Sequence, residues 1–227
     1  VAAQIVMILI GVQVIVAGTI RTLDSLGWWR LGSDPVRESL LQGLTLQGLS
    51  LAVLAAALRL RGWSWGRAFG LHLRGAIRQA GAGLACYAGV LPLFFSGAVV
   101  SRLCMFLLGE PATLQDVVLI FLDPQSGWAL LGLMGLAMIL APLAEELLFR
   151  GILLPLLVRR LGAGAGVCLS AALFALVHFH LPSALPLFVL GVGLALASIY
   201  TRSLLVPIVM HALFNGMNLT LLLLAAG

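Results

Sequence analysis

The sequence predicts an all-α protein, a polytopic transmembrane helical bundle of about seven to eight spans, and two observations support this fold class. Of the 227 residues, 62% are hydrophobic and only 9% are charged, whereas soluble domains carry about 25% charged residues. Several apolar stretches also approach the roughly 20 residues that a helix needs to cross about 30 Å of hydrocarbon. We therefore expect an integral membrane protein in contact with the lipid bilayer, organised as one membrane domain over residues 1–227.

Apolar stretches along the chain predict seven spans. They cover residues 1–20, 41–58, 79–101, 126–148, 163–181, 184–200 and 204–225. The stretches 103–108 and 113–122 could add an eighth, interfacial or re-entrant helix. The segment 161–201 has no Asp, Glu, Lys or Arg and is too long for one crossing. We expect Pro182 and Pro186 to divide it, because proline interrupts a continuing helix.

Arginine, which supplies all 13 basic residues, gathers in alternate loops of this topology. The loops after the second, fourth and sixth spans contain Arg59, Arg61, Arg67, Arg74, Arg78, Arg159, Arg160 and Arg202. Cytoplasmic loops are enriched in basic residues, so we predict a cytoplasmic N-terminus and an external C-terminus. The same rule accounts for the net charge of +5 without nucleic acid, which we do not expect as a partner. The absence of lysine is typical of a GC-rich genome and favours a bacterial inner membrane.

Three short motifs place polar side chains inside predicted spans, where ionisable residues are costly and indicate function. They are EELLFR at 145–150, FALVH at 174–178 and HALFN at 211–215. Glu146 and Arg150 are four residues apart and can pair on one helix face. Glu145 points about 100° further round the helix and stays free of that pair.

The depths of these residues in the membrane agree with one another. Measured from the predicted cytoplasmic ends of their spans, Glu145 and His178 lie about 21 and 22 Å deep at 1.5 Å per residue. By the same measure His211 and Asn215 lie about 14 and 20 Å deep, on one face of their helix. We expect the four side chains to surround one water-reachable cavity that opens toward the cytoplasmic side.

In order and type, the three motifs resemble those of the CPBP family, the CAAX-protease and bacteriocin-processing membrane peptidases, also called the Abi family. The resemblance covers about residues 110–225. It implies that residues 1–109 form N-terminal spans and that residues 110–227 form the catalytic core of an intramembrane peptidase. Such an enzyme hydrolyses a peptide bond in a peptide or protein substrate at the membrane.

The resemblance also implies a role for each motif residue. Glu145 would activate a water molecule that His178 helps to hold, and His211 and Asn215 would stabilise the oxyanion, as donors in a dry site do effectively. The supporting residues would be Glu146, Arg150 and Phe174.

Other interpretations remain open at this stage. No cofactor is favoured, although Glu145, His178 and His211 could instead hold a divalent metal such as zinc. A proton or solute transporter would favour paired repeats, and the sequence shows none. A catalytically silent scaffold or immunity factor would be expected to lose a catalytic position, whereas all four are present.

Overall fold

A computed structural model describes residues 18–19, 22–23, 25–27, 35–72, 74–111, 113, 115, 119–122 and 127–226. The helices are α2 (Pro35–Leu60), α3 (Trp65–Phe69), α4 (Ala76–Leu108), η1 (Ile120–Leu122), α6 (Gly127–Gly135), α7 (Ala141–Glu146), α8 (Leu154–Leu161), α9 (Ala163–Leu176), α10 (Leu181–Thr201) and α11 (Leu205–Ala226). The π-helical segments η2 (Leu136–Leu140) and η3 (Leu147–Leu153) join α6, α7 and α8 into one continuous helix, Gly127–Leu161. These described residues contain no strand, which confirms the predicted all-α class.

Five of these helices are long and apolar enough to cross a membrane, in the part of the chain that the structure describes. They are α2, α4, Gly127–Leu161, α10 and α11. Helix α9 is also apolar but has only 14 residues. The predicted span 1–20 lies almost wholly outside the described residues, as do residues 114 and 116–118 of the stretch 113–122. The prediction of an integral membrane protein is confirmed, and the five long apolar helices among the described residues are roughly compatible with the seven or eight spans expected.

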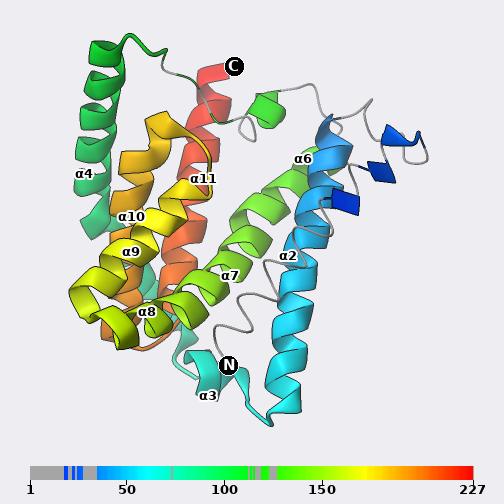
Figure 1. Ribbon diagram of the computed structural model, residues 1–227, viewed down its shortest axis with the longest axis vertical. Coiled ribbons are helices and arrows are strands. Elements are labelled where there is room, and N and C mark those ends of the chain that lie inside the picture. The colour runs from blue at the N-terminus through cyan, green and yellow to red at the C-terminus, as the bar shows by residue number, and fades with distance from the viewer. Residues whose placement is uncertain are drawn as a thin grey trace.

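The helices form two groups on either side of the long helix (Figure 1). Helices α4, α9, α10 and α11 pack together on one side, with α10 in contact with α4, α9 and α11. Helix α2 lies on the other side and contacts α6, η2 and α7. The helix Gly127–Leu161 carries Glu145 and Glu146 and is called the acidic helix below. It therefore runs between the two groups. The largest apolar core lies on the α10 side and includes Phe174, Leu190, Leu194, Val206 and Met210.

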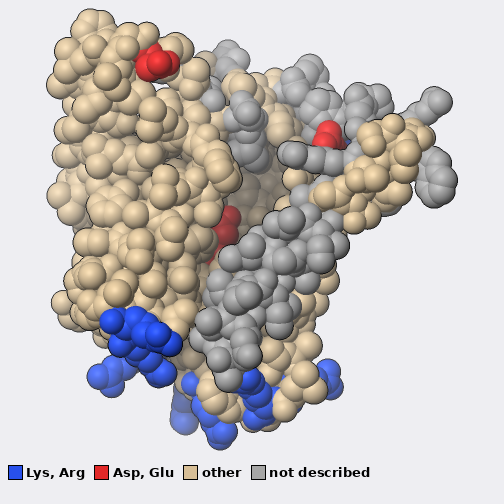
Figure 2. Space-filling view, in the orientation of Figure 1, with Lys and Arg blue, Asp and Glu red and all other residues tan. Residues whose placement is uncertain are grey.

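The arginines of the predicted cytoplasmic loops gather at one end of the molecule. The ends of the helices meet there through hydrogen bonds: Leu204 donates its backbone N–H to the Phe69 carbonyl, and the Ser203 hydroxyl donates to Gln79. Figure 2 shows the blue arginine atoms at this end and acidic atoms in a hollow about halfway along the molecule. Arg102 is an exception, because α4 continues to Leu108 and carries it toward the opposite end.

The boundaries around the second and third motifs differ from those predicted. The helix with the acidic motif continues to Leu161 instead of ending near residue 148. Helix α9 ends at Leu176, and α10 begins at Leu181 with Pro182 in its first turn. Pro182 therefore lies at the boundary, as predicted, whereas Pro186 lies inside α10 and does not interrupt it.

A contact with α4 explains why Pro186 is tolerated. Proline has no N–H to donate to the carbonyl four residues earlier, which here belongs to Pro182. The buried hydroxyl of Ser101 donates to that carbonyl instead, at 2.8 Å. A tertiary hydrogen bond thus replaces the helical one, and α10 stays continuous.

Candidate active site

The helix that carries Glu145 and Glu146 has an irregular backbone on both sides of them. Within Gly127–Leu161, the wider π-helical segments η2 and η3 flank the six-residue α7. Pro142 and Pro155 each stand in the first turn after one of these segments. A proline ring would collide with the carbonyl four residues earlier in a regular α-helix, and a wider turn relieves that collision. Single π-turns in α-helices are frequent at functional sites.

Glu146 is the centre of a buried ionic network. Its Oε1 accepts a hydrogen bond from the Arg150 guanidinium at 2.8 Å, and the two side chains are 0% and 1% exposed. The predicted pair is therefore present. The same Oε1 lies 2.9 Å from Nδ1 of His211, which is also buried. Glu146 thus joins the first motif to the third, a contact that sequence spacing could not reveal.

Arg150 is held by a third helix as well. Its second terminal nitrogen donates to the carbonyl of Gly191 on α10 at 3.1 Å. A Cβ at Gly191 would lie 3.1 Å from the Cα of Ala171 on α9, so glycine allows these two helices to approach closely. The guanidinium carbon also lies 4.5 Å from the centre of the Phe174 ring, within the range of a cation–π contact. The network therefore connects the acidic helix, α9, α10 and α11.

Glu145 differs from its neighbour, although the two residues are adjacent. Its side chain is 29% exposed, and its Oε2 lies 3.9 Å from Nε2 of His211, beyond hydrogen-bond length. That oxygen is itself buried and has no hydrogen-bond partner among the described residues. Glu145 therefore faces His211 with a carboxylate oxygen that no described residue engages. The predicted division between a paired Glu146 and a free Glu145 agrees with this geometry.

His178 lies in the turn after α9, which ends at Leu176, whereas the predicted span 163–181 had placed it inside the helix. The last four carbonyls of a helix lack donors within the helix. Here residues of the turn donate hydrogen bonds to them. The backbone N–H groups of residues 177, 178 and 179 donate to Leu173, Ala175 and Leu176. The remaining carbonyl, that of Phe174, lies 2.8 Å from Nδ1 of His178. Because a carbonyl only accepts, Nδ1 must donate, and the neutral ring then carries its lone pair on Nε2.

The Phe174 ring contacts the imidazole rings of both His178 and His211. It is fully buried, and its centre lies 5.0 Å from the His178 ring and 5.6 Å from the His211 ring. Both contacts are edge-on, the geometry that aromatic pairs favour. Phe149 packs against Phe174 in the same way at 5.3 Å. Phe174 thus packs against both imidazoles, and its supporting role stays a prediction.

Asn215 lies one turn after His211 on α11 and is fixed by the π-helical segment. Its side-chain amide donates to the backbone carbonyl of Ala137, in η2, at 2.7 Å. One of its two N–H groups is therefore engaged, and the second is available for another acceptor. The side chain is partly exposed. A hydrogen bond to η2 places Asn215 beside the acidic helix but leaves its role in chemistry to experiment.

The turn that contains His178 has an unusual backbone conformation. Phe179 has a φ of 48°, in a region that bulky residues rarely adopt and that costs about 1–3 kcal/mol. Its side chain is 95% exposed. The next residue, His180, uses both ring nitrogens: Nδ1 lies 2.8 Å from the Ser183 hydroxyl and Nε2 lies 3.1 Å from the Thr113 hydroxyl. This turn is therefore held from two directions.

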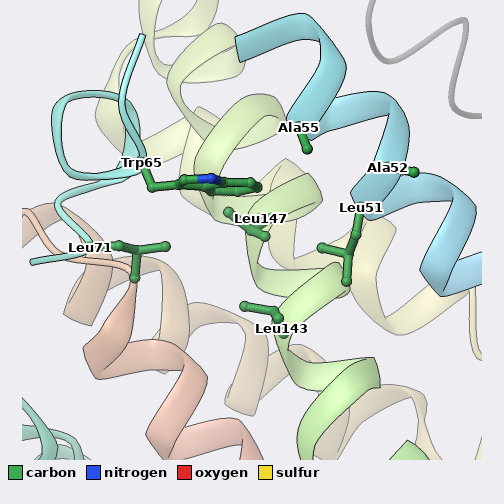
Figure 3. Close-up of a pocket in the computed structure, with 7 residues that line it drawn as sticks. All are labelled: Leu51, Ala52, Ala55, Trp65, Leu71, Leu143 and Leu147. Atoms are coloured by element: carbon green, nitrogen blue, oxygen red, sulfur yellow. The ribbon is translucent and has the colours of Figure 1, made fainter. Parts of the chain in front are cut away.

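An apolar cavity of about 460 Å³ lies between α2, α3 and the acidic helix. Figure 3 shows Leu143 and Leu147 on one wall, residues of α2 on another and the Trp65 ring across the cavity. Its full lining is Leu51, Ala52, Ala55, Trp65, Leu71, Leu143 and Leu147. The wall residues Leu143 and Leu147 are two positions before and after Glu145, which places them on the opposite face of the helix. The cavity is therefore separate from the polar site.

The structure does not show a ready metal site. Among the described residues, no group of three or more His, Cys, Asp or Glu side chains is placed to hold a metal ion. In this part of the chain Glu145, His178 and His211 therefore do not form a preassembled ligand set. The question of metal dependence stays a prediction for experiment.

A comparison with protein families agrees with the motifs. Residues 127–217 match the family model described as type II CAAX prenyl endopeptidase Rce1-like. This range begins with α6 and ends two residues after Asn215, so it contains all the site residues described above. Neither the curated proteins nor the solved structures yielded a match to the chain. Over residues 127–217 the chain is therefore similar to the Rce1-like type II CAAX prenyl endopeptidase family, in agreement with the membrane-peptidase family that the three motifs resemble.

Proposed function

We propose that the chain is an intramembrane endopeptidase in which Glu145 is the general base. The observation that carries this proposal is the buried Oε2 of Glu145, which has no described partner and faces the His211 ring. A general base must lie within about 3 Å of the proton that it removes, directly or through one water. Oε2 of Glu145 and Nε2 of His211 are 3.9 Å apart and not hydrogen-bonded to each other, so a reacting molecule could contact both atoms. Oε2 of Glu146 also has no described partner, but Glu146 is unsuited to this role because its side chain is fully buried and its Oε1 is paired with Arg150 and His211.

His178 would hold the same water molecule by its second hydrogen. The Phe174 carbonyl keeps the proton of the neutral imidazole on Nδ1, so Nε2 can only accept. A water that donates one hydrogen to Glu145 and the other to His178 keeps an oxygen lone pair for attack. The tautomer of His178 thus supports a water-holding role over that of an oxyanion donor.

Hydrolysis would then proceed in two proton-balanced steps. As the water oxygen attacks the peptide carbonyl carbon, Glu145 accepts its proton and the carbonyl oxygen becomes an oxyanion. The C–N bond breaks as the tetrahedral intermediate collapses, and Glu145 returns the proton to the departing amine. The free N–H of Asn215 and the Nε2–H of His211 would donate to the oxyanion, where such bonds are worth most.

His211 can donate through Nε2 only when its ring is protonated on both nitrogens. Its Nδ1 lies 2.9 Å from a carboxylate oxygen that also receives the Arg150 guanidinium, so Nδ1 must supply a proton. Glu146 already neutralises Arg150, so the charge of the imidazolium would be offset by the Glu145 carboxylate, 3.9 Å from Nε2. We therefore assign Glu146 a role in orienting His211 through Nδ1, as carboxylates do beside functional histidines, in addition to its pairing with Arg150.

The family match favours an enzyme over the two other interpretations. A silent scaffold or immunity factor needs no base with an available oxygen, and a transporter needs no domain of this endopeptidase family. For the substrate, we propose a membrane-associated peptide or protein, and the family description makes a prenylated CAAX tail the first to test. We also propose a bacterial inner membrane with the arginine-rich end and the active-site opening in the cytoplasm, because basic residues favour that side.

The cleavage of a reporter peptide by Glu145→Gln tests this proposal. Glutamine keeps the shape of the side chain but cannot accept the proton of water. The purified protein in detergent would be assayed with paired fluorogenic peptides, one farnesylated on a C-terminal CAAX cysteine and one not. We expect Glu145→Gln to lose activity by at least about 10²-fold, the lower end of general-base contributions. A variant as active as the wild type would refute the assignment of Glu145.

A metal-dependent mechanism would give a different result in the same assay. Each protein would be measured after treatment with a zinc chelator and after the addition of Zn²⁺. If activity disappears with the chelator and returns with zinc, the metal-free mechanism is wrong, and Glu145, His178 and His211 become candidate ligands.

A further inference from the structure

The turn between α9 and α10 presents His178, yet the backbone inside it is unfavourable. The turn contains residues 177–180, and Phe179 at its centre has a φ of 48°. Glycine and asparagine adopt this left-handed conformation readily, whereas a bulky aromatic residue does not. The Phe179 ring is almost fully exposed in the described structure and makes no packing that would offset the strain. Other contacts must hold the turn in this conformation.

His180 supplies the contacts that lie immediately after the strained residue. Its Nδ1 bonds to Ser183 in the first turn of α10, and the Ser183 backbone N–H donates back to the His180 carbonyl. Its Nε2 bonds to Thr113, which is 67 positions away in the connection between α4 and α6. The ring therefore fastens the end of the turn to its own helix and to a distant segment. A ring with both nitrogens engaged in this way is poorly suited to proton transfer.

We propose that His180 is a positioning residue for His178, and that its bonds to Ser183 and Thr113 hold the strained turn so that the Nε2 of His178 faces the site. This inference rests on the proposed function, because it takes His178 to be the residue that holds the water. Without His180, Phe179 relaxes toward a negative φ. The hydrogen bond from His178 Nδ1 to Phe174 is then lost in part of the population, and that part is inactive.

The kinetic test combines the loss of His180 with a backbone rescue. His180→Leu should lower kcat about tenfold, equivalent to about 1.4 kcal/mol, with KM changed less than about twofold. Ser183→Ala and Thr113→Val should each give part of this loss. The control is Thr220→Val, since the exposed Thr220 hydroxyl bonds only within α11, to the Gly216 carbonyl. This control should keep wild-type kcat.

The rescue separates positioning from a general structural role. Replacement of Phe179 by glycine or asparagine removes the backbone strain, so Phe179→Gly or Phe179→Asn in the His180→Leu background should restore most of the lost kcat. If His180 instead contacted substrate or stabilised the whole fold, neither change would restore it. A lack of rescue by both variants, or a His180→Leu protein with unchanged kcat, overturns the proposal.

A second measurement does not depend on cleavage. Histidine-selective ¹⁵N NMR in detergent micelles should show His178 as the tautomer protonated at Nδ1, assigned by its loss in His178→Gln. In His180→Leu this signal should shift toward a mixture of tautomers, and Phe179→Gly should restore it. A wild-type protein that cleaves nothing but shows these changes contradicts only the proposed function. An unchanged His178 signal in His180→Leu contradicts the positioning role.

Discussion

Exchange of each neighbouring glutamate for glutamine provides a matched test of the site. Glu145→Gln and Glu146→Gln make the same chemical change at adjacent positions of one helix. Glu146 is fully buried and pairs with Arg150 and His211. Glu145 is 29% exposed, and its Oε2 lies 3.9 Å from the His211 ring, too far for a hydrogen bond. The structure therefore predicts that the first change removes a reactive group and that the second destabilises the fold.

The size of the difference follows from burial. In Glu146→Gln the Arg150 guanidinium stays buried without a counter-charge, and the new amide N–H group has no acceptor. The removal of one partner of a buried ion pair costs about 3–5 kcal/mol. A chain of this size loses about 2–4 °C of Tm per kcal/mol, so Tm should fall on the order of 10 °C. For Glu145→Gln we expect a change of less than about 1 kcal/mol, typical of partly exposed sites without such partners.

Thermal unfolding in one detergent, followed by circular dichroism, measures both variants against the wild type. Arg150→Met in the Glu146→Gln background should recover part of the lost Tm, because the double variant no longer contains the unpaired charge. Equal Tm values for the two single variants would show that Arg150 does not depend on Glu146. A Glu145→Gln protein with the larger loss would reverse the roles assigned to the two carboxylates.

Two further substitutions test separate contacts. Asn215→Ala should lower kcat by about 10²–10³-fold with little change in KM, because an oxyanion donor acts mainly in the transition state. Asn215→Asp should be at least as damaging. If steady-state cleavage by Asn215→Asp is as fast as that of the wild type, the oxyanion role is wrong. Ser101→Ala should cost on the order of 1 kcal/mol because it leaves the part-buried Pro182 carbonyl without its donor. A Tm equal to that of the wild type would mean that α10 does not need this bond.

Sequence patterns predicted contacts within one helix better than contacts between helices. The pair of Glu146 and Arg150 follows from a four-residue spacing. Helix rise placed Glu145 level with His178 and not with His211, although the structure brings Oε2 of Glu145 to 3.9 Å from Nε2 of His211. The bonds from His211 to Glu146 and from Asn215 to Ala137 depend on how α11 packs against the acidic helix. No spacing within one motif contains that information.

Helix ends were harder to predict for a different reason. Val177 and Phe179 continue the apolar character of α9 on either side of His178, so composition gives no clear sign that the helix stops at Leu176. The turn requires a positive φ at a phenylalanine, whereas glycine or asparagine would have signalled it. At Pro186 the sequence predicted a helix break that the structure does not have. The hydrogen bond that Pro186 cannot donate to Pro182 is replaced by one from Ser101 on α4.

The position of Arg150 and Glu146 on one helix matters before the protein is assembled. An arginine or an acidic residue at the centre of a single inserted helix costs about 2.5–3.5 kcal/mol in translocon-based scales. These two side chains lie four residues apart and can neutralise each other, so Glu145 is the only carboxylate of this motif that enters the lipid without a counter-charge on its own helix. The contact of His211 with Glu146 can form only when α11 docks. Biogenesis can thus place the acidic helix in the bilayer first and complete the catalytic site afterwards.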